Sequence, residues 1–242
     1  MVKAKDLSVT YPDGTRAIES VSFTLRAGEN TALLGANGAG KSSLILSLVG
    51  ILPSEGSVEA DGVKLTKKNL AKIREKIGVL FQNPDDQLFM ASIGDDVACG
   101  PRNMGLSEEE TARRTDAALA ALNSEHLRGK TALKLSGGEK RLAALATVLS
   151  MSPDVMLFDE PTAFLDSRAR RVLINVLRGL PQTKLIATHD LAFAAELCER
   201  AIVLKEGRIA ADGSLREILC NSALLEECGI EPPDTELGGI RK

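Results

Sequence analysis

The sequence lacks the long apolar segments that place a protein across a membrane. Its longest apolar run, residues 44–52, is broken by Ser47 and closed by Pro53. That run is far shorter than the roughly 20 apolar residues that a membrane-spanning helix needs. Residues 1–6 also lack the apolar stretch of a signal peptide. We therefore expect a chain that works in the cytosol and does not itself span a membrane.

Cysteine, histidine and net positive charge are also scarce. There are four cysteines and two histidines, and the formal net charge is −3. Cys99, Cys198, Cys220 and Cys228 form no CxxC pair and have no histidine cluster near them, so we expect no structural zinc and assign them no role. Because the chain has no overall basic field, nucleic acid is not an expected partner.

What the sequence does contain suffices for a sizeable core, since 44% of its 242 residues are hydrophobic. A chain of this length forms one large domain, or one domain with an inserted subdomain. Residues 2–9 and 21–25 alternate apolar and polar side chains, which predicts two strands. The turn residues 11–14 between them complete a predicted β-hairpin, and a second small hairpin is predicted at 56–65.

Short apolar runs separated by helical stretches predict a parallel α/β sheet. The predicted strands are 31–34, 77–81, 155–158, 185–187 and 202–204. From Pro84 to about Pro153 the pattern is helical, so this stretch interrupts the sheet as an insertion. The expected organisation is a core with a β subdomain (1–82 and 154–230), a helical subdomain (83–153) and a peripheral tail (231–242).

Residues 35–42, GANGAGKS, fit the GxxxxGK[ST] pattern of a phosphate-binding loop. They lie between a predicted strand and a predicted helix, the context that such a loop needs; a plain glycine-rich turn is the alternative. Backbone N–H groups in the loop and at the helix start favour anions. Lys41 would neutralise the outer phosphates, and Ser42 would bind Mg²⁺. The predicted cofactor-binding residues of this loop are Gly35, Asn37, Gly38, Ala39, Gly40, Lys41, Ser42 and Ser43.

Residues 155–160, VMLFDE, read as a buried strand that ends in two carboxylates. Ligands of α/β proteins bind at the carboxyl ends of the strands. Asp159 can therefore hold Mg²⁺ through water, and Glu160 can orient and polarise an attacking water. The alternative is two solvated acids without a role.

Residues 135–139, LSGGE, form the most informative stretch of the chain. Taken alone, they could be a helix start, because serine is a good N-cap and glycine lets backbone approach backbone. A hydroxyl and glycine N–H groups at a helix start also form a site for an anion. The motifs found elsewhere in the chain favour the second interpretation.

These motifs occur in the order that is typical of the ATP-binding cassette (ABC) family. Over nearly its whole length, the chain resembles an ATPase subunit of that family. The resemblance implies a P-loop NTPase fold: a RecA-like parallel sheet core, an N-terminal antiparallel β subdomain and an inserted α-helical subdomain. It implies that Tyr11 stacks on adenine and that Asp166 belongs to the D-loop. It also implies that Gln82 senses Mg²⁺ and the γ-phosphate, and that His189 contacts the γ-phosphate. Taken alone, Tyr11 would be a plain hairpin residue, Gln82 a surface polar residue and His189 a structural histidine.

The resemblance further implies a sandwich dimer with ATP between two subunits. The phosphate loop of one subunit would face Ser136, Gly137 and Gly138 of the other. The second subunit would be a copy of this chain or a close paralogue. Two residues depart from the family pattern: Glu139 stands where glutamine is more usual, and Phe164 replaces a small residue.

Residues 81–89 and 95–101 are similar to the ATPases of energy-coupling-factor importers, which serve cobalt, nickel, biotin and other vitamins. The implied partners are a transmembrane coupling protein and a substrate-binding membrane protein, at the cytoplasmic face of the cell membrane. Cobalt or nickel is the first choice of cargo. Residues 83–86 could instead be a plain acidic turn, and Phe89 and Met90 could pack in the core as easily as anchor a partner.

Three other classes compete with an importer subunit. A non-transport ABC ATPase of translation or DNA maintenance usually has two cassettes or a long coiled coil, and this chain has neither. A phosphate-loop kinase or GTPase would not explain residues 135–139, and the guanine-reading Asn-Lys-x-Asp is absent. A nucleotide-binding regulatory module without turnover would often lack the base at Glu160.

Overall fold

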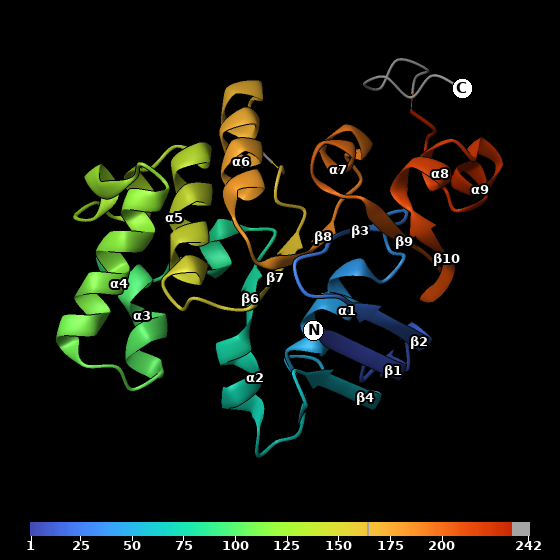
Figure 1. The fold of residues 1–242 in the computed structure, drawn as a ribbon, viewed down its shortest axis with the longest axis horizontal. Coiled ribbons are helices and arrows are strands. Elements are labelled where there is room, and N and C mark those ends of the chain that lie inside the picture. Colours follow the sequence, from blue (N-terminus) through green and yellow to red (C-terminus); the bar gives the residue numbers. More distant parts are fainter. Residues whose placement is uncertain (164, 234–242) are drawn as a thin grey trace.

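The computed structural model describes residues 1–163 and 165–233, and the strands in these ranges form two sheets. Within them, the larger sheet has six strands in the order β10-β9-β3-β8-β7-β6 (Figure 1). These are β3 (Asn30–Leu34), β6 (Ile77–Leu80), β7 (Val155–Asp159), β8 (Thr183–Ala187), β9 (Arg200–Lys205) and β10 (Arg208–Ser214). Neighbours are parallel except β9 and β10. The predicted parallel α/β sheet is confirmed, and β10 is an antiparallel edge strand that the sequence analysis did not predict.

The smaller sheet is antiparallel and contains both predicted hairpins. The first pairs β1 (Val2–Thr10) with β2 (Arg16–Leu25), so that Val2 lies opposite Leu25. The second joins β4 (Glu55–Ala60) to β5 (Val63–Lys64), and β4 also pairs with β1. The two predicted hairpins are therefore confirmed and belong to one sheet, in the order β2-β1-β4-β5.

The parallel strands are buried on both faces, and successive side chains enter two different cores. Leu157 of β7 lies in the core between the two sheets, with α1 (Lys41–Leu48). Its neighbour Phe158 lies in the core on the other face, together with residues of the helices that follow β6 in the chain. This alternation is the period of two that a strand imposes. Because both faces are covered, the strands are continuous apolar runs, which explains why they are easily predicted.

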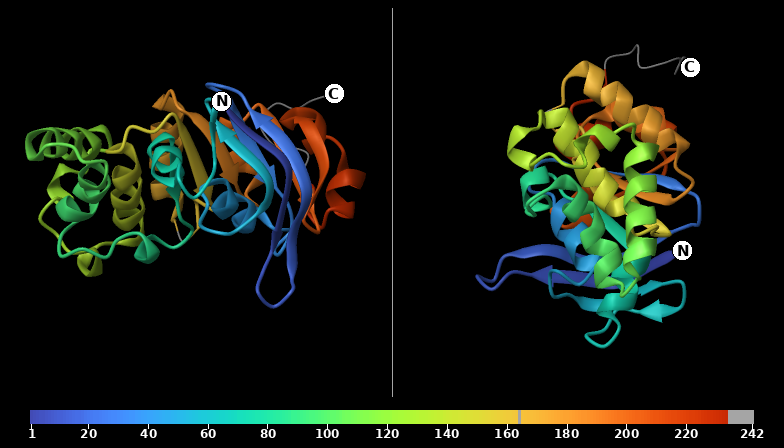
Figure 2. Two further views of the ribbon diagram at one scale, coloured as in Figure 1. Left: turned by 90° about the horizontal axis from the view of Figure 1, so that it is seen from below. Right: turned by 90° about the vertical axis from the view of Figure 1, so that its left-hand side faces the viewer.

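Residues 83–153 contain α3 (Ile93–Asn103), α4 (Glu108–Ala121) and α5 (Gly137–Leu149), with short 3-10 turns between them. Figures 1 and 2 show these helices, coloured green to yellow, to one side of the parallel sheet. Each helix begins after a serine whose side chain accepts a backbone N–H: Ser92, Ser107 and Ser136. Helix α5 packs closely on the sheet, since a Cβ on Gly78 would lie 2.4 Å from Val148 Cγ1. The boundaries at residues 83 and 153 stay a prediction.

The remaining helices cover the sheet or its edges. They are α2 (Leu70–Lys76), α6 (Ser167–Gly179), α7 (Leu191–Leu197), α8 (Leu215–Leu219) and α9 (Ser222–Glu227). In the described ranges, no helix has the length and apolar character that crossing a membrane requires. The chain after α9 returns to the phosphate loop: Gly229 and Ile230 line a cavity of about 240 Å³ together with Ala36. Most of the tail predicted to be peripheral, residues 234–242, lies outside the described ranges.

Candidate active site

The predicted phosphate loop lies between β3 and α1, and its glycines have the backbone conformations that the loop requires. Gly38 and Gly40 have positive φ angles of 82° and 104°. A Cβ on Gly40 would also lie 2.5 Å from the carbonyl oxygen of Ala17, so a larger residue does not fit. Among the described residues, no side chain caps the start of α1. Its first N–H groups therefore remain available to an anion, as a phosphate site needs.

Lys41 places its ammonium group inside the loop. The side chain is 7% exposed, and Nζ donates hydrogen bonds to the carbonyl oxygens of Gly35 at 2.7 Å and Ala36 at 3.2 Å. Glu160 Oε1 lies 3.9 Å from the same nitrogen. Burial lowers the pKa of Lys41, and the carboxylates of Glu160 and Asp159 oppose that shift. A buried cation thus stands where phosphate charge is expected.

Asp159 ends β7 with a carboxylate that the protein does not fully satisfy. It is 7% exposed, and its Oδ1 has no hydrogen-bond partner among the described residues. Burial raises the pKa of Asp159, and a hydrogen bond with the Ser42 side chain opposes the shift. An unsatisfied buried carboxylate oxygen is costly unless a cation or donor reaches it. A carboxylate and a hydroxyl beside a phosphate loop are the oxygen ligands that Mg²⁺ prefers, so these residues fit that ion.

Glu160 and His189 come together at the same edge of the sheet. His189 Nδ1 lies 2.9 Å from Glu160 Oε2, and the His189 backbone N–H donates to that oxygen at 3.4 Å. Glu160 is 6% exposed and has a left-handed φ of 44°. For a residue other than glycine this conformation costs about 1–3 kcal/mol, and such strain clusters at active sites. The parallel pairing of β7 and β8 sets the contact, because Asp159 lies opposite Ala187.

Gln82 follows β6, and its backbone is held by a residue that the sequence analysis did not single out. Arg141 of α5 donates from Nη2 to the Gln82 carbonyl at 2.6 Å and from Nη1 to the Phe81 carbonyl at 2.7 Å. Arg141 is 1% exposed. A signal was present: Arg141 shares the i, i+3, i+7 face of a helix with Ala144 and Val148, where an apolar residue is expected.

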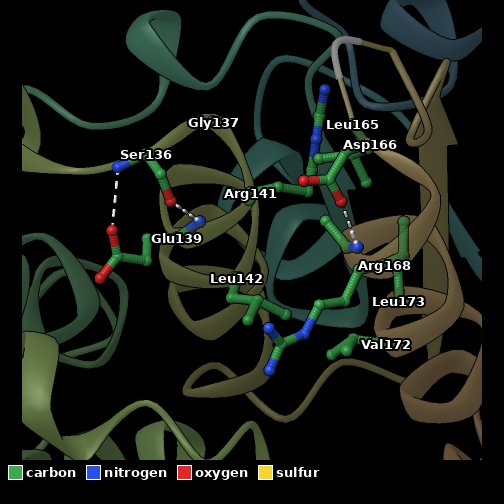
Figure 3. A pocket seen from close by; sticks show the side chains of 12 residues that line it. Ser136, Gly137, Glu139, Arg141, Leu142, Leu165, Asp166, Arg168, Val172 and Leu173 are labelled. Atoms are coloured by element: carbon green, nitrogen blue, oxygen red, sulfur yellow. Dashed lines mark hydrogen bonds between the residues drawn. The ribbon is translucent and has the colours of Figure 1, made fainter.

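The LSGGE motif forms the start of α5, and the hydrogen bonds there show what Glu139 does. Ser136 Oγ accepts the backbone N–H of Glu139, and Glu139 Oε2 accepts the backbone N–H of Ser136 at 2.9 Å (Figure 3). This reciprocal pair is a capping box. The bond from the Ser136 backbone, then that from Lys130, lower the pKa of Glu139 to about 2. Glutamate in place of the usual glutamine therefore puts a negative charge at the start of α5. Its Oε1 lies 3.2 Å from Lys130 Nζ.

The start of α5 faces the start of α6 across a groove of about 630 Å³, here named the signature groove. It is lined by Ser136, Gly137, Gly138 and Leu142 of α5 and by Asp166 and Ala169 of the α6 end (Figure 3). Asp166 caps α6, since Oδ1 accepts the Ala169 N–H at 2.7 Å. A Cβ on Gly138 would lie 3.1 Å from that of Ala169, so these helix starts are close neighbours. Phe164 lies outside the described residues.

Apart from Gln82, whose backbone Arg141 holds, the predicted site residues fall into two groups on one chain. Around the phosphate loop lie Lys41, Ser42, Asp159, Glu160 and His189; Tyr11 joins them through its hydroxyl, 2.9 Å from Ser43 Oγ. Ser136, Gly137, Gly138 and Asp166 instead line the signature groove, to which the phosphate loop contributes no residue. The structure does not unite the two groups within one chain.

The parallel sheet, the phosphate loop and the acids that end β7 define a P-loop nucleoside triphosphatase. Among such proteins, the LSGGE motif at the start of a helix indicates an ATP-binding cassette. A family model described as ABC transporter matches residues 18–163. The chain belongs to the ABC transporter family as an ATP-binding subunit, and it is an ATPase.

Individual relatives agree with this assignment. The chain is 42% identical over 236 residues to the energy-coupling factor transporter ATP-binding protein EcfA of Carboxydothermus hydrogenoformans, covering 96% of this chain and 87% of that protein. The structure of CbiO1 from Clostridium perfringens, part of the ABC transporter complex CbiONQ, matches with a TM-score of 0.79 and 39% identity over 93% of each chain. A dimeric cassette bound to ADP and Pi after hydrolysis matches with a TM-score of 0.80 and 29% identity, over 89% of this chain and 99% of that one.

Proposed function

We propose that this chain is the ATP-hydrolysing subunit of an energy-coupling-factor importer, acting at the cytoplasmic face of the cell membrane. The observation that carries the proposal is that residues 81–89 and 95–101, the two segments similar to such importers, meet in the fold. The buried Asp96 accepts the backbone N–H groups of Phe89 and Met90 through Oδ1, both at 2.9 Å. The second segment thus fixes the backbone of the first.

This arrangement presents apolar side chains to solvent. Phe89 is 68% exposed and Met90 is 40% exposed. Phe89 borders a cavity of about 360 Å³, here named the lateral groove, which Arg74 of α2, Cys99 and Met104 near α3, and Met151 also line. Of the two alternatives left open for Phe89 and Met90, packing in the core does not fit this exposure. An exposed aromatic side chain beside an apolar groove suits a partner helix laid into it, and the transmembrane coupling protein is the proposed partner.

The proposed chemistry is ATP hydrolysis in which Glu160 acts as the base. Glu160 is held by His189 and stands 3.9 Å from Lys41, so its carboxylate is fixed beside the phosphate loop. Its role is to orient and polarise the attacking water, and Lys41 holds the outer phosphates. Gln82 and His189 would read the γ-phosphate, and Tyr11 would stack on adenine. Mg²⁺, when bound by Ser42 and Asp159, supplies neutralisation of phosphate charge.

The proposed assembly contains two ATPase subunits, the coupling protein and a substrate-binding membrane protein. The signature groove and the phosphate loop are separate on one chain, which supports ATP bound between two subunits. The similarity to EcfA and to CbiO1, part of the CbiONQ complex, supports membrane partners. We propose cobalt or nickel as the cargo, with biotin and other vitamins as the alternatives.

Co-purification tests the importer proposal. The chain is expressed together with a candidate transmembrane coupling protein, and detergent-solubilised membranes are captured on the coupling protein. Phe89→Asp should reduce recovery of the ATPase at least about tenfold, because it places a charge in an apolar contact. Ile51→Asp is the matched control, since Ile51 is 46% exposed and does not line the lateral groove. Equal recovery of Phe89→Asp and wild type would contradict the docking site.

A further inference from the structure

The segment between β6 and α3 is tied to α5 by three side chains in succession. Arg141 donates to the carbonyls of Phe81 and Gln82. Gln87 donates from Nε2 to the Ala144 carbonyl at 3.0 Å, and its Oε1 accepts the Phe81 N–H at 3.2 Å. These bonds join both ends of the segment 81–87 to one helix.

The third tie lies in the middle of the segment. Lys140 Nζ lies 2.6 Å from Asp85 Oδ1, and the Lys140 side chain is 21% exposed. An exposed ion pair of this kind contributes little, typically below about 1 kcal/mol. The buried Arg141 bonds are therefore the strongest of the three ties, since they are charge-assisted and shielded from water.

We propose that Arg141 is a positioning residue for Gln82: it fixes the Gln82 backbone to the helix that begins with the signature serine. The proposal rests on the role proposed for Gln82 in sensing Mg²⁺ and the γ-phosphate. Ser136 caps α5 and Arg141 lies on the second turn of the same helix. A displacement of α5 when Ser136 engages a nucleotide would therefore move Gln82 with it.

The chemistry of the guanidinium suits this task. Its planar fork reaches two successive carbonyl oxygens at 2.6 and 2.7 Å, which a single ammonium cannot match in geometry. Burial lowers the pKa of Arg141 to about 10, and Asp159 opposes the shift, so the side chain remains charged at neutral pH. Its Nε has no hydrogen-bond partner among the described residues. A buried charge with one unused donor lowers the free energy of unfolding. Its presence therefore indicates a role other than stabilising the fold.

Arg141→Met removes the donors at similar side-chain length, and Lys184→Met is the matched control. Lys184 is likewise a buried cation, 2% exposed, that donates to backbone carbonyls, those of Leu180 and Gln182. It lies at the start of β8, at the end of the sheet opposite the site. Both variants should melt at lower temperature than wild type. A loss confined to Arg141→Met is therefore not explained by the removal of a buried charge.

The first readout is amide hydrogen exchange of the free protein without nucleotide or Mg²⁺. Arg141→Met should increase the exchange rate of residues 81–87 at least about tenfold, and Lys184→Met should leave it unchanged. The second readout is ATPase activity at fixed ATP and varied Mg²⁺. Arg141→Met should lower kcat between about tenfold and a hundredfold and raise the half-saturating Mg²⁺ concentration. Arg141→Lys should recover part of both losses, because it keeps the charge and a donor.

A double-mutant cycle with Gln82→Ala decides whether Arg141 acts through Gln82. If it does, Arg141→Met causes no further loss of kcat in the Gln82→Ala background. Independent, multiplicative losses would overturn the proposal. So would wild-type exchange and Mg²⁺ dependence in Arg141→Met when Gln82→Ala is impaired. Wild-type activity in Gln82→Ala would instead overturn the role of Gln82, and with it this inference, and would leave the docking at Phe89 unaffected.

Discussion

Glu160 is the residue whose surroundings argue most directly for catalysis. It combines burial, a left-handed backbone and an imidazole partner 2.9 Å away. None of these features stabilises the fold in an obvious way, since a buried carboxylate and a strained φ both cost free energy. The surrounding residues hold Glu160 there, and the catalytic role that we propose for it would explain why these costs are tolerated.

Substitution Glu160→Gln keeps the shape of the side chain and removes its basicity. ATP binding should remain within about twofold of wild type, whereas hydrolysis should slow at least about a hundredfold. Titration with a fluorescent nucleotide measures ATP binding, and single-turnover experiments with radiolabelled ATP measure the rate of hydrolysis. The control is Glu29→Gln, a carboxylate that pairs with Arg200 away from the phosphate loop. Wild-type turnover in Glu160→Gln would remove the base assignment.

Glu139 gives a pH-dependent contribution to stability with a definite sign. Its pKa in the folded protein is about 2, lowered by the Ser136 backbone and Lys130 from 4.5. A group whose folded pKa is lowered stabilises the fold above its unfolded pKa and loses that contribution as pH falls through the folded value. Wild type should therefore exceed Glu139→Gln in the free energy of unfolding above pH 5, and the difference should shrink toward pH 3. Urea denaturation at several pH values measures it; a difference that grows on acidification would contradict the capping-box account.

At the residue scale, the phosphate loop and the strand-end acids could be predicted from the sequence, because each is a short motif whose conformation depends on residues close together in the chain. It did not predict Arg141, because the bonds to Phe81 and Gln82 join residues about sixty positions apart. The effect of Glu139 could not be predicted from the sequence either. The capping box is local, but the pairing with Lys130 depends on how the preceding turn folds.

At the scale of elements, α5 connects the most features of the molecule. It begins at the signature serine, holds the segment 81–87 along its length, and packs against β6 at Gly78. The close approach at Gly78 leaves no room for a methyl group, with Val148 Cγ1 at 2.4 Å and Pro153 Cγ at 3.1 Å from a built Cβ. This contact fixes the helix relative to the catalytic edge of the sheet.

Gly78→Ala should therefore destabilise the protein by about 1–3 kcal/mol, the usual cost of overpacking. Gly129→Ala is the control, because a Cβ there meets nothing within 4 Å and its φ is ordinary. Val148→Ala should offset part of the loss in the double variant, because it removes the clashing Cγ1. Urea denaturation of wild type, Gly78→Ala, Val148→Ala, the double variant and Gly129→Ala gives the five free energies of unfolding. Equal stability of Gly78→Ala and Gly129→Ala would show that α5 does not pack on β6 as described.

Two of the elements that the sequence did not predict, α2 and β10, share a physical cause. In α2 only Ile73 is buried, and in β10 no residue is, so neither has a continuous apolar stripe or run. Their conformations follow from neighbours: β10 pairs with β9, and α2 lies between β5 and β6. Strands such as β7 and β8, buried at every position, were predictable from their apolar residues alone.

At the scale of the whole molecule, the two halves of the nucleotide site stand apart on one chain. The phosphate loop lies between β3 and α1, whereas the signature groove is lined by residues of α5 and α6. Figure 1 labels these four elements. Each half offers backbone N–H groups at a helix start and lacks the groups that the other half carries. We therefore propose that a second chain supplies the missing half and completes the site.

Mixing two inactive variants tests this claim most directly. Lys41→Ala disables the phosphate loop, and Ser136→Arg disables the signature groove; each alone should be inactive. In a mixed dimer, one of the two sites joins an intact loop to an intact signature groove. An equimolar mixture should therefore recover about a quarter of the wild-type specific activity, since half the dimers are mixed and each has one working site. A mixture no more active than its separate components would contradict a site shared between two chains.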